Sequence, residues 1–155
     1  MQDCSLTDVT ETPYLYVKRS ATMDPDDISN KMGAAFHDVW GFMQSNGIEP
    51  AGPALSVYYT HAEGRMDFRA GFVVARDQMG KAAGAIKADV TPAGRVLHFT
   101  HKGPYATLRD HYSDLMAYAD AQGLRIGAPA WELYLNDPGQ VAPEDLLTEV
   151  YVSLE

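Results

Sequence analysis

Apolar residues recur along this chain in two alternating patterns, and each pattern occurs twice. Between residues 24 and 47 the apolar side chains are three or four residues apart, which predicts an amphipathic helix with Ile28, Met32, Phe36, Val39 and Met43 on one face. Asp24 followed by Pro25 fits the start of this helix, and Gly47 fits its end. A second helix ends before Gly123 and has the same spacing at Leu108, Tyr112, Leu115 and Ala119.

Each predicted helix follows one strand and precedes two more. The first set of expected strands lies near residues 14–17, 54–60 and 68–75, and the second near 95–101, 131–135 and 148–154. The linker between the two sets contains a further short candidate strand at 85–90. This order predicts an α+β fold with antiparallel sheets, two main helices on one side and a central ligand groove.

The two sets of elements also match each other in sequence. Residues 46–59 align without gaps onto 122–135 at an offset of 76, and 71–73 align onto 150–152 at an offset of 79. We therefore predict a tandem duplication of a strand–helix–strand–strand unit, with repeat 1 at about 12–77 and repeat 2 at about 92–155. Because a half of this size does not readily close its own core, we expect residues 1–155 to form one domain.

Strand alternation assigns the side chains of the second hairpin to two faces. One face is apolar and suited to covering by the helices, with Trp131, Leu133, Leu135, Val150, Val152 and Leu154. The other face is expected to hold two carboxylates and two phenols, those of Glu132, Tyr134, Glu149 and Tyr151. The corresponding face of the first half has Ser56, Tyr58 and Phe72. This predicts an aromatic groove with acidic groups on one wall only.

Aromatic faces and a partly desolvated carboxylate both attract a cation. A lipophilic or aromatic cation is therefore the ligand that such a groove would accept. The alternative from the pattern alone is that Glu132 and Glu149 lie on an ordinary solvated sheet face with half-exposed tyrosines. Alternation does not distinguish the two interpretations.

Charge and composition exclude several other functions. The net charge is -9 and no basic stripe is present, which disfavours direct binding of nucleic acid. The chain lacks a long apolar run or a secretion signal, and Cys4 is its single cysteine, so we expect a cytoplasmic protein. We expect no metal, because His98 and His101 on one strand point to opposite faces, and no cofactor, because no phosphate or dinucleotide loop is present.

Four segments of the second half resemble a known family: residues 92–95, 101–105, 131–138 and 143–151. They are similar to the gyrase-inhibitor-like small-molecule-binding domain, which is also the effector-binding domain of multidrug-sensing transcription activators. The resemblance is weaker over the first half, but order and repeat agree across roughly residues 12–155. It implies a central groove between two repeats and ligands that are often bulky lipophilic cations.

The resemblance also implies roles for individual residues. It makes Glu132 the acid that contacts the cation, with Tyr134 and Tyr151 as walls and Tyr58 facing them from the first repeat. Glu149 is a second candidate acid. Phe72 belongs to the same predicted face, and Tyr105 is either a groove-edge aromatic or part of a turn that orients the second helix.

The resemblance leaves three functions open. The first is a stand-alone module that binds a small molecule. The second is a hydrolase in which Glu132 activates water against a cyclopropane-bearing or other electrophilic compound. The third is a protein-interaction module such as a gyrase inhibitor. Regulators of this type carry a helix-turn-helix, for which the 155 residues leave no segment, so we do not expect transcription control in cis.

Overall fold

The computed structural model describes residues 4–22, 24–62, 65–136 and 140–155, and confirms the α+β class. Asp137 and Pro138, which end one of the four family-like segments, lie outside these ranges. The elements in chain order are β1 (Ser5–Val9), β2 (Pro13–Thr22), α1 (Pro25–Ser45), β3 (Ala54–Ala62), β4 (Arg65–Val73), η1 (Arg76–Lys81), β5 (Lys87–Val90), β6 (Gly94–Lys102), η2 (Tyr105–Thr107), α2 (Leu108–Ala121), β7 (Ile126–Tyr134), η3 (Pro143–Asp145) and β8 (Leu147–Leu154).

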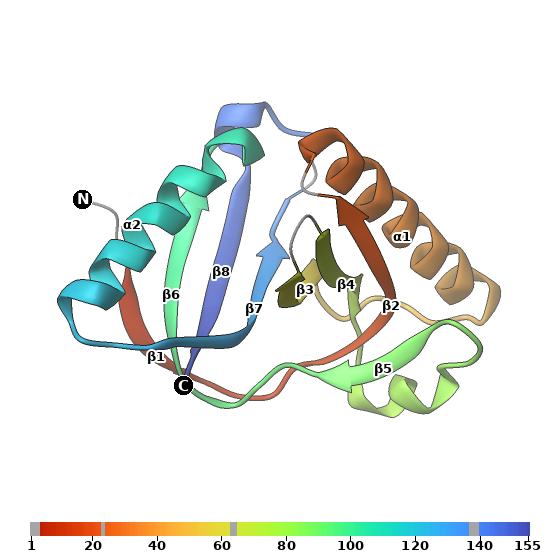
Figure 1. Ribbon diagram of the computed structural model, residues 1–155. Helices are drawn as coiled ribbons and strands as arrows, with labels where there is room; N and C mark the ends of the chain where they lie inside the picture. Colours follow the sequence, from red (N-terminus) through yellow and green to blue (C-terminus); the bar gives the residue numbers. More distant parts are fainter. Residues whose placement is uncertain (1–3, 23, 63–64, 137–139) are drawn as a thin grey trace.

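The strands in the described part of the chain form one sheet in the order β1-β6-β8-β7-β3-β4-β2-β5. Every pairing is antiparallel, and the pairing of β3 with β7 joins the first set of elements to the second. Both main helices lie on the same side of this sheet, with α2 over β6 and β8 and α1 over β2 and β4 (Figure 1).

The ends of both helices agree with the sequence signals. The carboxylate of Asp24 accepts a hydrogen bond of 2.9 Å from the backbone N–H of Asp26, and Pro25 is the first residue of α1. Gly47 and Gly123 follow the two helices with positive φ angles of 66° and 69°, which is the conformation that favours glycine. These local signals therefore fixed the helix ends correctly.

Each helix covers its own apolar core. The core under α1 includes Leu15, Val17, Val39, Met43 and Phe68, and the core under α2 includes Leu97, Phe99, Leu115, Val150 and Val152. A third core lies on the opposite side of the sheet and includes Tyr14, Leu55, Val57, Val73, Val96 and Trp131. Both sides of the sheet are therefore apolar over much of their area.

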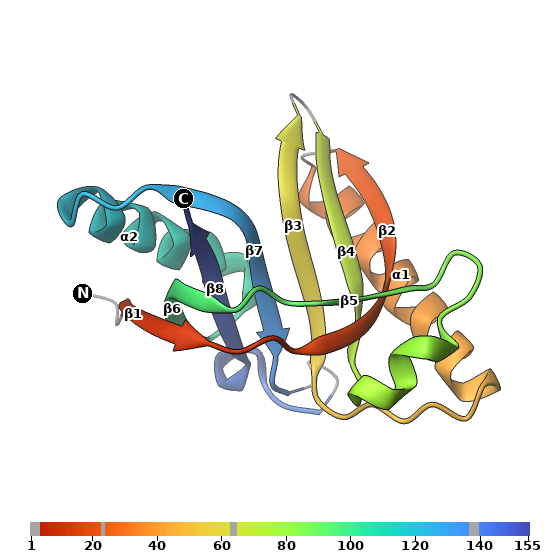
Figure 2. The same cartoon turned by 90° about the horizontal axis from the view of Figure 1, so that it is seen from below.

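Two segments cross the side of the sheet that the helices leave open. Figure 2 shows the chain from β1 to β2 and the chain from β5 to β6 running across the sheet there. Thr12 and Thr91 connect the two segments, because the N–H of Thr12 donates to Thr91 Oγ1 and the N–H of Thr91 donates to the Thr12 carbonyl, both at 3.0 Å. The first segment begins with β1, which pairs with β6 and which the polar N-terminal sequence did not predict.

The strand register corrects the expected sorting of the second hairpin. Glu132 pairs with Val150, and Trp131 pairs with Tyr151, so Trp131 and Val150 lie on opposite faces. Since Ser56 pairs with Ala70 in the first hairpin, the two hairpins correspond at an offset of 80 and not 79. A shift of one residue moves every side chain to the other face, which is why the predicted faces were wrong.

We name the two faces by a row of paired residues in each. The helix face carries the row Phe99, Val150, Glu132, Ser56 and Ala70. The far face carries the row His98, Tyr151, Trp131, Val57 and Arg69. No helix in the described ranges is both long and apolar enough to cross a membrane.

Gly71 provides a test of how closely β2 and β4 approach each other. A Cβ atom at this position would lie 1.7 Å from the backbone carbonyl oxygen of Leu15. Gly71→Ala should therefore lower the free energy of unfolding by at least about 3 kcal/mol, because backbone must move to accept it. Gly33→Ala is the matched control: this exposed α1 position has open space around it, so the same change should stabilise the protein by about 0.5–1 kcal/mol. Urea unfolding measures both, and equal midpoints would contradict the strand geometry.

Candidate functional site

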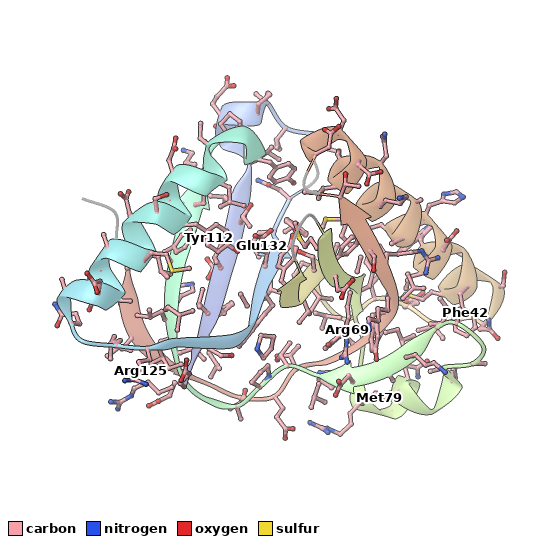
Figure 3. The ribbon with its side chains drawn as sticks, viewed as in Figure 1. Phe42, Arg69, Met79, Tyr112, Arg125 and Glu132 are labelled. Atoms are coloured by element: carbon pink, nitrogen blue, oxygen red, sulfur yellow. The ribbon has the colours of Figure 1, made fainter. Side chains whose placement is uncertain are left out.

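Glu132 lies in β7 on the helix face, beside its partner Ser56 on β3. Its side chain is buried, with the residue only 5% exposed. Figure 3 shows Glu132 and Tyr112 of α2 close together on the helix side of the sheet. A carboxylate is therefore held where the two halves of the molecule meet.

Hydroxyl groups surround this carboxylate. Tyr112 donates a hydrogen bond of 2.5 Å to Glu132 Oε2, and Tyr134 donates one of 2.7 Å to Oε1. The Ser56 hydroxyl lies 2.6 Å from the Tyr134 hydroxyl and 3.1 Å from that of Tyr58. Each carboxylate oxygen thus has a phenol donor, and Ser56 connects the phenols of the two halves.

Burial dominates the electrostatics of the site. Removal from water raises the pKa of Glu132, while hydrogen bonds from Tyr112, Tyr134 and Tyr58 and the charge of His101 act in the opposite direction. Burial and the nearby Glu132 charge likewise raise the pKa of Tyr58, Tyr112 and Tyr134 well above the usual value. The phenols therefore remain protonated donors, and the acid retains its proton to a higher pH than an exposed glutamate.

Aromatic rings from both halves extend the site. Phe36 of α1 makes edge contacts with Tyr134 at 6.0 Å and with Phe72 at 5.9 Å between ring centroids. Phe72 also packs against Trp40 at 5.5 Å, and Tyr105 of η2 packs against Tyr134 at 5.8 Å. Trp40 and Tyr105 are the most exposed of these rings, so the aromatic cluster continues from the buried acid to the surface.

The structure separates the predicted site residues into two groups. Five of them lie together on or beside the helix face: Glu132, Tyr134, Tyr58, Phe72 and Tyr105. Glu149 and Tyr151 instead lie on the far face, opposite Leu133 and Trp131. The expectation that Glu149 and Tyr151 share a face with Glu132 is wrong, because the second hairpin has a different register.

Glu149 has its polar partners within the protein on the far face. Its carboxylate makes a short contact with the His98 ring and accepts a hydrogen bond of 2.6 Å from Thr100. Glu132 differs, since within the described ranges it forms no ion pair with a Lys, Arg or His side chain. Of the two acids, Glu132 is the one whose described hydrogen-bond partners are all phenol groups.

Sequence reasoning did not identify Tyr112 and Phe36 as site residues. Both align with each other at the offset of 76, and their helical spacing predicts that they face the apolar core. In the structure Tyr112 donates to Glu132 and Phe36 packs against Tyr134, which the sulfur of Met32 on α1 also contacts. An aromatic at the same aligned position of both helices was the available signal.

The histidines of β6 are placed as strand alternation requires. His98 faces Glu149 and Tyr151, whereas His101 is buried on the helix face, with its Nδ1 3.1 Å from Nδ1 of His111. No group of three or more His, Cys, Asp or Glu side chains in the described residues has the arrangement of a metal site.

The site is thus a buried acid with phenol donors, next to a cluster of aromatic side chains that extends to the surface. The chain belongs to the GyrI-like small molecule binding domain family, whose model matches residues 2–155. No curated protein sequence matches it.

Solved structures share the fold. EcmrR, seen in a complex with DNA, is 23% identical with a TM-score of 0.82 over 99% of this chain, which spans 57% of the length of that protein. A hydrolase from Listeria innocua is 14% identical with a TM-score of 0.65, covering 99% of this chain and 92% of that one. SAV2435, bound to tetraphenylphosphonium, is 11% identical with a TM-score of 0.65, covering 99% and 94%.

The raised pKa of Glu132 predicts a specific pH dependence of stability. Above the ordinary glutamate pKa, Glu132 ionises in the unfolded chain while the folded protein still holds its proton, so the folded state binds more protons. Its contribution therefore weakens folding as the pH rises from the ordinary pKa to the raised one. Glu132→Gln removes this effect, so its free energy of unfolding relative to the unmodified protein should increase from pH 4.5 towards neutrality.

Urea unfolding at several pH values measures this difference. Glu144→Gln, at an exposed position, is the control and should run parallel to the unmodified protein at every pH. A parallel curve for Glu132→Gln as well would contradict the buried state of this acid.

Proposed function

We propose that this chain binds a lipophilic, aromatic cation in a groove between α1 and α2, with Glu132 as the counter-charge. The observation that carries the proposal is a buried carboxylate with neutral phenol donors and, in the described ranges, no ion-pair partner. A cation that enters would recover Coulomb energy at low local dielectric, and aromatic faces add to this attraction. That SAV2435 holds tetraphenylphosphonium on the same fold supports this choice of ligand.

We also infer that the two sets of elements are tandem copies and that the groove follows from this. Ser56 and Glu132 correspond at the offset of 76, and they are direct partners across β3 and β7. An antiparallel pair of equivalent residues lies on a local two-fold axis, so equivalent helices fall on either side of it. At this axis the first set of elements has the small hydroxyl of Ser56 and the second has the carboxylate of Glu132. The acid is therefore on one wall only.

Titration calorimetry with tetraphenylphosphonium tests the proposal. Glu132→Gln should weaken binding at least tenfold, because it removes the charge and leaves the shape, while the neutral analogue triphenylphosphine oxide should lose less than threefold. Affinity of the unmodified protein should also increase with pH as Glu132 loses its proton, and the variant should lack that slope.

Glu149→Gln is the matched control for this titration. It removes the same charge from the far face and should change the affinity less than twofold. Equal losses in the two variants, or equal losses for cation and neutral analogue, would reject charge pairing by Glu132.

A second candidate function is hydrolysis, which the electrostatics of Glu132 favour. Burial raises its pKa, which suits a group that takes and returns a proton. The carboxylate could take a proton from a water molecule as the water oxygen bonds to a ring carbon; the strained C–C bond then breaks, and the released carbon takes the proton back from Glu132. The Listeria innocua neighbour named as a hydrolase shares the fold. Both Glu132 oxygens already accept phenol hydrogen bonds, so a water must be accepted in addition to them.

Turnover of a cyclopropane-bearing electrophile in ¹⁸O-labelled water distinguishes hydrolysis from binding. A hydrolase should release ring-opened product carrying the label, detected by mass spectrometry, and Glu132→Ala should remove at least 99% of the rate while the protein remains folded by circular dichroism. Saturable binding without labelled product would support the binding function and reject hydrolysis.

A further inference from the structure

Two buried histidines lie on the helix face near Glu132. His101 of β6 and His111 of α2 are 6% and 4% exposed, and their Nδ1 atoms are 3.1 Å apart. Ala35 of α1, which is also buried, aligns with His111 at the offset of 76. His111, like Glu132, therefore stands where the first set of elements has a small residue, and packing under a helix does not by itself require an imidazole.

The hydrogen bonds of this pair fix where its protons lie. His101 Nε2 is 3.1 Å from the carbonyl oxygen of Pro104, which can only accept, so this nitrogen carries a hydrogen. In the uncharged pair His101 Nδ1 is then the acceptor, and His111 donates to it from Nδ1. The pair can take up one proton, whereas a second would set two N–H groups against each other. Phe99 stacks on the His111 ring with centroids 3.7 Å apart, and an aromatic face favours the charged imidazole.

The strand register places His101 in the row next to that of Glu132. His101 pairs with Thr148, and Thr148 pairs with Tyr134, which donates its hydroxyl hydrogen to Glu132. Strands β6 and β7 are two strand spacings apart, roughly 10 Å, and the intervening Thr148 is fully buried. Buried charges attract each other over such a distance because solvent screens them little. The charge of His101 accordingly acts to lower the pKa of Glu132.

Glu132 is the buried acid that faces this pair. The other charged side chains described on the neighbouring elements are exposed, and they are Asp110 and Asp114 of α2, Glu144 and Asp145 of η3, and Lys102 on the far face of β6. The remaining titratable groups described on this side are the thiol of Cys4, which packs against the core under α2, and the phenols of Tyr105, Tyr112 and Tyr134. A positive charge on the pair is therefore answered from within the described interior by Glu132.

We propose that the His101–His111 pair is the internal counter-charge of Glu132, and that it holds one proton which leaves when a ligand cation reaches this acid. The inference rests on the cation binding proposed for Glu132 and adds the regulation of that site by protons. Proton and cation compete because the same carboxylate attracts both, while they repel each other. A protonated pair weakens cation binding by the same factor by which the bound cation weakens proton uptake.

The first test needs no ligand. In the full chain with ¹³C,¹⁵N-labelled histidine, NMR follows the His101 ring signals against pH, with assignment from His101→Gln, which keeps a donor for the Pro104 carbonyl. Glu132→Gln should lower the midpoint of this titration by about 0.5 pH unit or more, because it removes the attraction of the carboxylate. Glu144→Gln, at an exposed position, is the matched control and should leave the midpoint unchanged. Equal midpoints in the unmodified protein and Glu132→Gln would overturn the proposal.

The second test adds saturating tetraphenylphosphonium to the unmodified protein. The midpoint of His101 should again fall by about 0.5 pH unit or more, while the ring signals of His37, on the exposed side of α1, should keep theirs. Saturable binding with an unchanged His101 midpoint would reject the competition and leave the cation site of Glu132 intact. If tetraphenylphosphonium does not bind, the proposed function and the competition both fail, and the first test alone decides whether the pair is the counter-charge of Glu132.

Discussion

The structure depends on the antiparallel pairing of β3 with β7. Five residue pairs, from Ala54 with Tyr134 to Tyr58 with Ala130, join two sets of elements into one sheet, and Ser56 with Glu132 is the central pair. Because side chains alternate along a strand, this register places Glu132, Ser56 and two tyrosines on the face that the helices flank. A slip by one residue would send Glu132 to the far face and bring Trp131 under the helices.

The same pairing explains how a carboxylate is tolerated in the interior. A buried acid is costly unless hydrogen bonds compensate it, and here the donors come from three directions: Tyr134 from its own strand, Tyr112 from α2, and Tyr58 from β3. Neutral donors offset the burial only in part, which is why the pKa remains raised. At this position the protonated acid is therefore favoured over the carboxylate to a higher pH than at an exposed position.

The sequence was most informative where structure is local. The extent of α1, the cap at Asp24 and the ends of both helices before their glycines follow from spacing and backbone preference alone. Glu132, Tyr134 and Tyr58 could be grouped because alternation puts them on one face of β3 and β7, which pair directly at Ser56 and Glu132. Strand β1 was missed because its alternation is weak and its pairing partner, β6, is about 90 residues away.

The register of the second hairpin could not be predicted for a physical reason. Alternation reveals the buried face of a strand only when the other face meets water, and here helices cover one face while two crossing segments cover part of the other. Trp131 and Val150 are both core residues, but they belong to cores on opposite sides of the sheet. Because both faces carry apolar residues, alternation does not distinguish the pairing of Glu132 with Glu149 from its pairing with Val150. The geometry of the hairpin decides between these two registers.

That register decides which partners each acid has. On the far face, the Glu149 carboxylate contacts the His98 ring and accepts a hydrogen bond from Thr100. On the helix face, the oxygens of Glu132 contact only neutral hydroxyl groups among the hydrogen bonds of the described residues. A charge balanced by its neighbours gains little from a ligand cation, whereas a desolvated charge held by dipoles gains most of what Coulomb attraction offers. The two glutamates are alike in sequence context, and they differ in their partners: an imidazole and a threonine for Glu149, and buried phenols for Glu132.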